Sequence, residues 1–473
     1  MKTPWIMAFV GLLLLSACDL QQQQTNQETA PGTSGDYAAF LDQVEAATFR
    51  YFWETTNPDN GLTPDRYPNP PFASIAAVGF ALPAYAVGVE RGYISRAEAT
   101  ERTLTTLRFF WQAPQGPQAT GVTGYQGFYY HFLDMQTGER YQTVELSTID
   151  TALLMGGVLF AQSYYDGSAP QETEIRALAD SIYRRTDWKW FADGGDRLRM
   201  AWHPEQGFGS ATWRGYNEAM LLLILSLGSP THPLPGEAWD VWTTTYRWGT
   251  FYGQEFVQFS PLFGHQYSHI FIDFREIQDD YMAGRGIDYF ENSRRATLAQ
   301  QAYAEDNPAG FTGYGAHFWG LTACDGPAGI TRTVSGDSVR FHTYWARGAS
   351  QNDIRDDGTL APTAAGGSIP FAPEICLPAL KAMSDWYGSR LYGQYGFLDA
   401  FNPSFTFTDV SPNHGTVDPV NGWVDDNYLG IDEGPILLMA ENYRSELVWR
   451  VLKQNKYIRA GLQKAGFTGG WLR

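Results

Sequence analysis

The chain alternates between helical segments and loops rich in aromatic residues and glycine, about ten to twelve times along its length. Residues 74–91 are apolar on nearly every side of the predicted helix, a pattern that requires burial on all faces. Residues 220–227 are also apolar, and Gly228 and Pro230 stop that run. No sustained βαβ alternation and no heptad repeat is evident. We therefore expect helical hairpins packed side by side, and a closed ring of hairpins would gather its long loops at one end.

The other helices are predicted from apolar periodicity and from residues that begin helices. Ser95 and Glu98 have the spacing of a capping box, and Pro373 with Glu374 begins another helix. Residues 331–371 are polar and Gly-rich and are expected to carry some strand. The further predicted helices span residues 36–56, 95–112, 147–165, 171–186, 237–252, 287–304, 373–387, 426–442 and 445–453.

The first residues have the features of a targeting segment. Lys2 precedes an apolar run over residues 5–15 that is too short to span a membrane. The tetrapeptide Leu-Ser-Ala-Cys at 15–18 matches a bacterial lipoprotein cleavage box, with Cys18 as the lipidated residue. An ordinary signal peptide with an incidental cysteine is the alternative. We expect a signal peptide over 1–17, a flexible tether over 18–35, a single domain over 36–473, and an exported lipoprotein at the periplasmic face of a bacterial membrane.

The charge and the aromatic content narrow the possible ligands. The chain has 33 Lys and Arg against 51 Asp and Glu, a formal net charge of -18. This charge disfavours nucleic acid and anionic membrane surfaces as partners, so the expected membrane contact is the lipid anchor alone. The 16 Trp and 27 Tyr stand beside Gly and Asp or Asn in many loops, an arrangement suited to stacking on sugar rings.

Cysteine and histidine give little indication of a metal site. Cys324 and Cys376 could form a disulfide in an exported protein or remain two buried thiols. His265 and His269, four residues apart, would share a face of a helix. The glutamate of an HExxH motif is missing beside His265, so polar sugar contacts are favoured over metal binding.

Cleavage of a glycosidic bond needs two carboxyl groups, one to protonate the leaving oxygen and one to activate water or attack carbon. Each candidate also has a structural explanation: Glu218 can simply begin a helix, Asp150 can belong to a buried network, and Asp432 can cap a helix. No G-x-S-x-G elbow, Walker motif or Rossmann motif offers other chemistry. The carboxylates predicted at loop–helix junctions are Glu145, Asp150, Glu218, Asp399 and Asp432.

Seven stretches, in order, resemble the glucoamylase-like domain family that includes bacterial endo-β-1,2-glucanases and β-1,2-glucooligosaccharide sophorohydrolases. The resemblance covers residues 37–457 and implies an all-α dominated (α/α)6 toroid with long aromatic loops and minor β structure. It also implies inverting glycoside hydrolysis of a β-glucan, most favourably β-1,2-linked, without metal or cofactor. The stretches are ELSTIDTALL (145–154), GYNEAMLLLILSLGSPTHP (215–233), GHQYSH (264–269), NPAGFTGYGAHFWGLTA (307–323), DGTLAPTAA (357–365), YGFLDAF (395–401) and residues 423–444.

The resemblance also implies roles for individual residues. Glu218 is similar to the family's proton donor, Asp399 to the base side, and Glu145 to a further acidic site residue. Apolar neighbours should keep Glu218 protonated, whereas Asp399 is expected in a loop beside water. The expected substrate contacts are Asp150, Trp213, Tyr216, His265, His269, Tyr314, Trp319, Trp423 and Asp432.

Two other functions remain open at this stage. A non-catalytic glycan-binding lipoprotein of an uptake system would keep the aromatic residues but need no proton donor. A lyase acting on uronic acids would favour a basic cleft, which the net charge of -18 disfavours. Endo or exo action and the length of the products also stay open.

Overall fold

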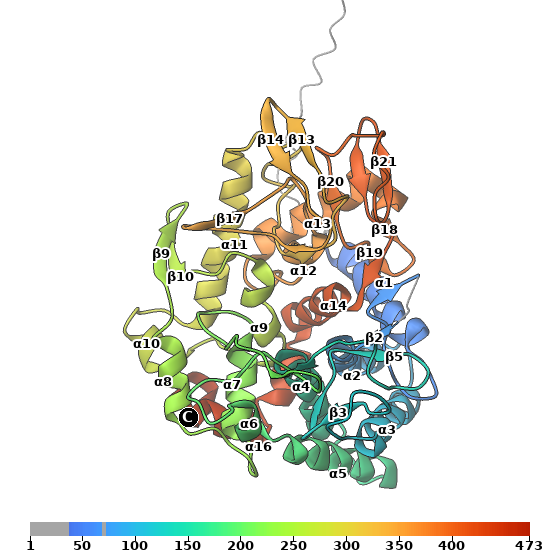
Figure 1. Cartoon of the computed structure of the whole chain (residues 1–473), viewed down its shortest axis with the longest axis vertical. Coiled ribbons are helices and arrows are strands. Elements are labelled where there is room, and N and C mark those ends of the chain that lie inside the picture. The colour runs from blue at the N-terminus through green and yellow to red at the C-terminus, as the bar shows by residue number, and fades with distance from the viewer. Residues whose placement is uncertain (1–36, 69–71) are drawn as a thin grey trace, which may run out of the picture.

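The computed structural model describes residues 37–68 and 72–473 (Figure 1). The predicted signal peptide, the lipidated Cys18 and the tether lie outside these residues. Within the described part of the chain, helices form the body of the molecule, and the strands occur only in sheets of two or three. None of the described helices has the length and apolar character needed to span a membrane.

The centre of the molecule is a ring of inner helices. Their residues are almost all buried, as the apolar runs at 74–91 and 220–227 predict. Neighbours in the ring pack on one another, and α9 is joined to α12 by Gln266, whose side-chain amide donates to Ala364 O at 2.8 Å. The inner helices are α2 (Ile75–Glu90), α4 (Thr148–Tyr164), α7 (Ala219–Gly228), α9 (Tyr267–Phe271), α12 (Pro362–Gly366) and α14 (Gly430–Ser445).

A second layer of helices packs around this ring. Most outer helices precede the inner helix that they form a hairpin with, and α16, near the C-terminus, covers α7. The outer helices bury one face only, so their sequences are amphipathic. This arrangement is the predicted (α/α)6 toroid. The outer helices are α1 (Ala38–Thr55), α3 (Arg96–Gln112), α5 (Pro170–Arg185), α8 (Glu237–Thr243), α11 (Tyr289–Asp306), α13 (Pro373–Tyr387) and α16 (Lys456–Lys464).

The inner ring is lopsided. Helices α2 and α4 have 16 and 17 residues, whereas α9 and α12 have five residues each. Helices α2 and α4 approach closely because glycines face each other at their crossing. A Cβ on Gly157 would lie 2.1 Å from Gly79 O, and a Cβ on Gly79 would lie 2.4 Å from Leu153 O. Only glycine permits this backbone contact. The crossing of α2 and α4 is therefore the most closely packed contact between inner helices.

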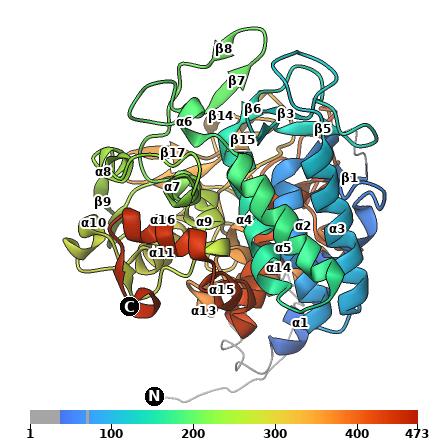
Figure 2. The ribbon, with the colours of Figure 1, turned by 90° about the horizontal axis from the view of Figure 1, so that it is seen from below.

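Figure 2 shows the strands β3 and β5–β8 together at one end of the ring. As predicted, residues 331–371 carry strands. The remaining helices are α6 (Trp188–Phe191), α10 (Asp280–Ala283) and α15 (Leu447–Leu452). The strands are β1 (Arg66–Tyr67), β2 (Phe72–Ser74), β3 (Gly124–Tyr125), β4 (Phe128–Tyr129), β5 (Phe132–Asp134), β6 (Leu146–Ser147), β7 (Ala201–His203), β8 (Gly207–Phe208), β9 (Trp248–Phe251), β10 (Gln254–Val257), β11 (Ile277–Gln278), β12 (Ala323–Cys324), β13 (Thr331–Val334), β14 (Asp337–Arg340), β15 (Trp345–Ala346), β16 (Gly348–Ser350), β17 (Asp353–Arg355), β18 (Tyr392–Gly393), β19 (Gly396–Phe397), β20 (Phe401–Asn402), β21 (Thr416–Asp418), β22 (Gly422–Val424), β23 (Tyr428–Leu429) and β24 (Thr468–Gly469).

Four sequence predictions about local structure can be compared directly. The capping box at Ser95 and Glu98 is present, and helix α13 has the predicted bounds. The predicted helix over 237–252 is wrong after Thr243, because Tyr252 and Gly253 take positive φ and turn the chain from β9 into β10. Cys324 and Cys376 are two buried free thiols, which excludes the disulfide alternative in this structure.

Candidate active site

A cavity of about 440 Å³ opens where the inner helices begin. The first residues or caps of α2, α4, α7, α9 and α14 contribute to its wall, so the ring itself sets its shape. Its wall combines carboxylates with aromatic rings, as a sugar-binding site requires. The lining residues are Asp65, Arg66, Phe72, Ser74, His131, Phe132, Ile149, Asp150, Leu153, Glu218, Phe263, Tyr267, Ala323, Tyr344, Leu429 and Ile431.

Glu218 lies in this wall, at the residue that precedes α7. Its Oε2 atom is buried and has no hydrogen-bond partner among the described residues. Burial, together with the nearby negative charge of Asp150, raises the pKa of Glu218 to about 7. The Ser268 hydroxyl in α9 donates to Glu218 O at 3.0 Å, so the main chain of Glu218 is held from the next inner helix. A carboxyl group with this pKa can hold a proton near neutral pH and release it in a reaction.

Asp150 lines the same cavity from the first turn of α4. The Ser147 hydroxyl donates to Asp150 Oδ2 at 2.5 Å and accepts from Asp150 N at 3.2 Å. His131 Nε2 lies 3.4 Å from Asp150 Oδ1, and His131 Nδ1 lies 2.8 Å from Glu145 Oε1. Glu145 itself does not line the cavity, so the structure places this predicted catalytic residue behind His131.

Aromatic rings form a further part of the wall. Phe72 and Phe132 pack with their centroids 4.6 Å apart, and Phe263 and Tyr267 are 5.3 Å apart. Tyr344 lies at the rim and is 55 % exposed. Such faces suit the apolar faces of sugar rings, whereas the carboxylates suit the hydroxyl groups.

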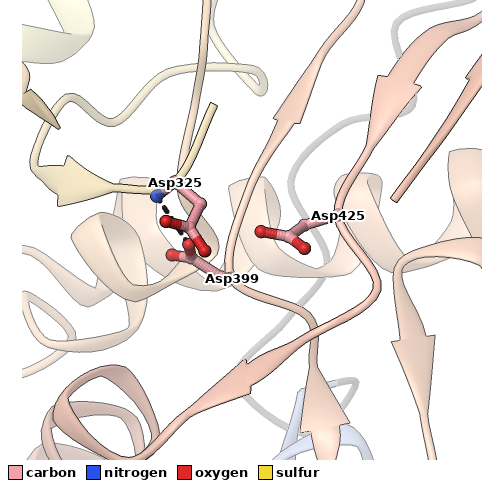
Figure 3. Close-up of side chains that lie close together, drawn as sticks. All are labelled: Asp325, Asp399 and Asp425. Atoms are coloured by element: carbon pink, nitrogen blue, oxygen red, sulfur yellow. Dashed lines mark hydrogen bonds between the residues drawn. The ribbon is translucent and has the colours of Figure 1, made fainter. Parts of the chain in front are cut away.

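A cluster of aspartates lies behind Arg66, which lines the cavity. Figure 3 shows Asp325, Asp399 and Asp425, whose carboxylates bring oxygens within 4.8 Å of one another. Asp399 Oδ2 accepts from Asp325 N at 2.7 Å, and the Arg66 guanidinium donates to Asp325 Oδ2 at 3.0 Å. Carboxylates at this spacing are one arrangement that could hold a cation, and shared protons are the other way to reduce their repulsion.

The predicted surroundings of Asp399 are wrong. The sequence places this residue in a loop beside water, but its side chain is buried and it does not line the cavity. Burial, with the charges of Asp432 and Asp325, raises the pKa of Asp399 well above the usual value. Asp432 is also buried, and burial raises its pKa to about 8. Burial therefore favours the protonated form of both Asp399 and Asp432.

The predicted sugar contacts of His265 and His269 are corrected by the structure. Both imidazoles are completely buried, and neither lines the cavity. His265 Nε2 lies 3.1 Å from Phe259 O, and His269 Nε2 lies 3.1 Å from Ser293 Oγ. Burial lowers the pKa of His265 to about 4 and that of His269 to about 3, so both are neutral core residues.

The same correction applies to the predicted aromatic contacts, none of which lines the cavity. Trp213 and Trp423 are buried and donate from Nε1 to Thr148 Oγ1 and His414 O, respectively. The sequence showed aromatic residues near loop carboxylates, but it could not show that the rings turn inward, since the core of a large toroid needs such side chains. Tyr216 and Trp319 likewise pack inside the molecule, and Tyr216 lies near Ser293. Tyr314 is half-buried and donates to Asp356.

Sequence reasoning missed several residues of the cavity, notably Asp65, Arg66, His131 and Tyr344. They come from loops far apart along the chain, and only the closure of the ring brings them together. His131 was within reach, because it directly precedes β5 in a segment rich in Gly and Tyr, 14 residues before the candidate Glu145.

Comparison with known proteins agrees with this architecture. The sequence profile of the Glycoamylase family, described as "Putative glucoamylase", matches residues 210–456, which include Glu218, Asp399 and Asp432. The chain belongs to the Glycoamylase family. Among solved Glycoamylase-like structures, a protein from Bacteroides uniformis described as a putative glucoamylase has a TM-score of 0.78 and 30% identity, covering 94% of this chain and 100% of that one.

Two relatives carry more specific descriptions. An endo-beta-1,2-glucanase from Chitinophaga pinensis, solved with sophorotriose and glucose, has a TM-score of 0.77 and 28% identity, covering 93% of this chain and 100% of that one. The exo beta-1,2-glucooligosaccharide sophorohydrolase of Parabacteroides distasonis is 29% identical over 461 residues. That match covers 90% of this Glycoamylase-family chain but only 57% of the sophorohydrolase.

Proposed function

We propose that this protein is a glycoside hydrolase that cleaves β-1,2-glucan or its oligosaccharides. The relatives described as a β-1,2-glucanase and a β-1,2-glucooligosaccharide sophorohydrolase support the substrate class. The cavity supports it independently, because it combines aromatic rings with carboxylates and gives a neutral polyhydroxylated ligand both kinds of contact.

One observation supports hydrolysis of the sugar rather than sugar binding alone. Glu218 faces the cavity with a buried carboxylate oxygen that has no partner among the described residues, and its pKa is raised to about 7 by burial. A sugar-binding protein gains nothing from an unpartnered carboxyl group, whose burial costs stability. A hydrolase needs it as the acid that protonates the departing glycosidic oxygen.

The proposed mechanism inverts the anomeric centre. Glu218 gives its proton to the glycosidic oxygen while a water molecule, losing a proton to a carboxylate, attacks the anomeric carbon from the opposite face. Asp399 is the proposed base. It must be ionised to act: burial, Asp432 and Asp325 oppose ionisation, whereas the positive charge of the nearby Arg66 favours it. The burial of Asp399 behind Arg66 also requires that the proton travel through water. Asp150 is the second candidate for the base, because it lines the cavity and is oriented by Ser147 and His131. Every step uses proton transfer between carboxyl groups and water, without a metal ion or cofactor.

Export is part of the proposal and rests on the sequence alone. The apolar run at 5–15 and the box ending at Cys18 favour a lipoprotein anchored at the periplasmic face of a bacterial membrane. Cys18→Ala should release the protein into the soluble fraction or block its processing. Unchanged membrane association with normal processing would show that Cys18 carries no anchor.

Product analysis tests the function directly. The protein is incubated with linear β-1,2-glucan and, separately, with β-1,3- and β-1,4-glucans, and the products are separated by chromatography. We expect cleavage of the β-1,2-linked polymer or its oligosaccharides, with reducing ends that have the α configuration when first released, as seen by NMR. Binding of β-1,2-glucan without release of product would instead indicate a glycan-binding lipoprotein.

A further inference from the structure

His131 lines the cavity wall, and only its contact with Asp150 has been given a role above. It lies between β4 and β5, lines the cavity, and stands between the two carboxylates Glu145 and Asp150. We propose that His131 is a positioning residue that clamps Glu145 and Asp150 together as a charged unit beside Glu218. This inference rests on the proposed hydrolysis for its effect on rate, whereas the clamp itself can be tested without any substrate.

The main chain of His131 is fixed on both sides. Its N–H donates to Glu145 O at 3.0 Å, and its carbonyl accepts from Ile75 N, the first residue of α2, at 3.3 Å. The ring stacks on Phe132, with centroids 3.9 Å apart and an interplanar angle of 23°. The imidazole therefore has little freedom to turn away from its two partners.

The ring nitrogens each face a different carboxylate. Nδ1 lies 2.8 Å from Glu145 Oε1, which is hydrogen-bond distance, and Nε2 lies 3.4 Å from Asp150 Oδ1. Both ring nitrogens can donate only in the doubly protonated imidazolium. This geometry therefore favours a protonated, positively charged His131. Its negative partner Glu145 lies in the segment before β6, and its negative partner Asp150 lies in α4.

The charged groups around His131 agree with this protonation state. Glu145, Asp150 and Asp65 are the titratable groups that face it, and Arg66 is the cation beside Asp65. Burial opposes the charged ring, but the three carboxylates outweigh burial and raise the pKa of His131 to about 9. Burial likewise opposes ionisation of Glu145, yet its hydrogen bond to His131 lowers the pKa of this carboxyl group.

The clamp acts on Glu218 through Asp150. The negative charge of Asp150 adds to burial in raising the pKa of Glu218, and a positive ring beside Asp150 offsets part of that charge. His131 therefore fixes the position of Asp150 and also limits how far the charge of Asp150 raises the pKa of Glu218. Loss of the ring should raise the pKa of Glu218 further, because Asp150 would then be uncompensated.

The clamp is tested first without substrate, by NMR of the full-length protein with 13C-labelled histidine, with the His131 signal assigned from its loss in His131→Gln. We expect the His131 ring to stay protonated through neutral pH and to titrate near pH 9. In Glu145→Gln, which keeps a hydrogen-bonding group but removes the charge, the midpoint should fall by about one unit or more. A midpoint near 6.5 in the unaltered protein would overturn the clamp.

Kinetics with β-1,2-glucan oligosaccharides test the consequence. His131→Gln should lower kcat by about a hundredfold and move the alkaline limb of the kcat/KM profile to higher pH. The control is His232→Gln, which removes an imidazole 3.6 Å from Asp187, far from the cavity lining, and should change neither quantity. An unchanged kcat, or a lower kcat with an unmoved alkaline limb, would reduce His131 to a structural residue and overturn the proposal.

The two proposals fail in different ways. If the unaltered protein cleaves no β-1,2-linked substrate, the proposed function fails, and the NMR titration still decides whether His131 holds the two carboxylates. If the unaltered protein is active but His131 titrates like a free imidazole, the clamp fails and the proposed function stands.

Discussion

Ser268 holds the main chain of Glu218 from the neighbouring inner helix. Its hydroxyl donates to Glu218 O at 3.0 Å and accepts from Leu221 N at 2.9 Å, so one side chain of α9 satisfies two backbone groups at the start of α7. The proposed acid is thereby fixed to a junction between two helices of the ring and does not depend on a mobile loop.

Replacing this hydroxyl should cost both stability and rate. Ser268→Ala leaves the buried Leu221 N–H without its partner, which costs about 1–3 kcal/mol in the free energy of unfolding. A lower kcat should follow, because the Glu218 backbone loses its support. Denaturant unfolding and steady-state kinetics check both effects. Ser181→Ala on the outer helix α5, where Ser181 only donates back to Ala177 O, is the control and should change stability by less than about 0.5 kcal/mol.

Glu218→Gln should abolish most activity while leaving the fold intact. The amide cannot donate a proton to the leaving oxygen, so we expect a loss on the order of a thousandfold in kcat with sugar binding largely kept. Circular dichroism and affinity for the oligosaccharide show whether the variant is folded. Glu237→Gln on the exposed start of α8 is the matched control. Near-normal turnover by Glu218→Gln would refute the assignment of the acid.

The pH profile gives the same assignment a second test. Because the acid must be protonated, and its pKa is raised to about 7 by burial, kcat/KM should fall as pH rises through about 7. A fall that instead begins near pH 4–5 would mean that Glu218 is ionised at neutral pH and cannot be the donor.

Two variants decide which carboxylate serves as the base. Asp399→Asn and Asp150→Asn both keep the size of the side chain but remove the ionisable group. If Asp399 is the base, its variant should lose on the order of a thousandfold in kcat. Asp150→Asn should then lose less kcat than Asp399→Asn. The alkaline limb of its kcat/KM profile should move to lower pH, because one negative charge near Glu218 is gone. The reverse order of losses would assign the base to Asp150.

Asp432 should make the protein less stable as pH rises. Burial raises its pKa from 3.8 to about 8, so the folded state binds this proton more tightly than the unfolded chain does. Its contribution is complete below about pH 4 and is lost as pH rises through about 8. Urea unfolding at pH 5 and pH 8 should therefore show a smaller difference in Asp432→Asn than in the unaltered protein. Asp240→Asn on the exposed side of α8 should leave the difference unchanged, and an equal difference in all three proteins would contradict the raised pKa of Asp432.

Chelation distinguishes shared protons from a bound cation in the cluster of Asp325, Asp399 and Asp425. We expect activity and melting temperature to be unchanged after exhaustive treatment with EDTA, since the proposed mechanism uses no metal. A loss that Ca²⁺ or Mg²⁺ restores, and that Asp425→Asn prevents, would show that the cluster is a cation site and would overturn the metal-free mechanism.

Much of the toroid follows from sequence pattern, since helices that are apolar on every side must lie inside others that are apolar on one side only. Helices α2 and α7 were predictable in this way. Pro373 with Glu374 marked the start of α13, and the capping box at Ser95 fixed the start of α3. The hairpin β9–β10 was missed because Trp248, Phe251 and Phe256 are equally compatible with a short helix. Helix α16 was overlooked although its sequence is strongly amphipathic.

The candidate site was predictable only in part. Glu218 and Asp150 could be found because each stands at the start of a buried helix, where a carboxylate draws attention. His265, His269 and Trp319 misled, because a polar or aromatic side chain looks the same in sequence whether it faces a cavity or satisfies the core. Which way a side chain turns depends on the closure of the whole ring, and no local pattern records that.

Because the inner helices differ in length, two parts of the ring differ in how well they tolerate changes of sequence. Around α2 and α4, the glycines at 79 and 157 lock two backbones together, so most substitutions there would push the helices apart. Around α9 and α12, the helices have only five residues, so connecting loops form more of the ring on this side. Descendants of such a chain could therefore lengthen or reshape the loops on the second side and acquire new preferences for chain length, while the proposed acid, Glu218, keeps its place before α7.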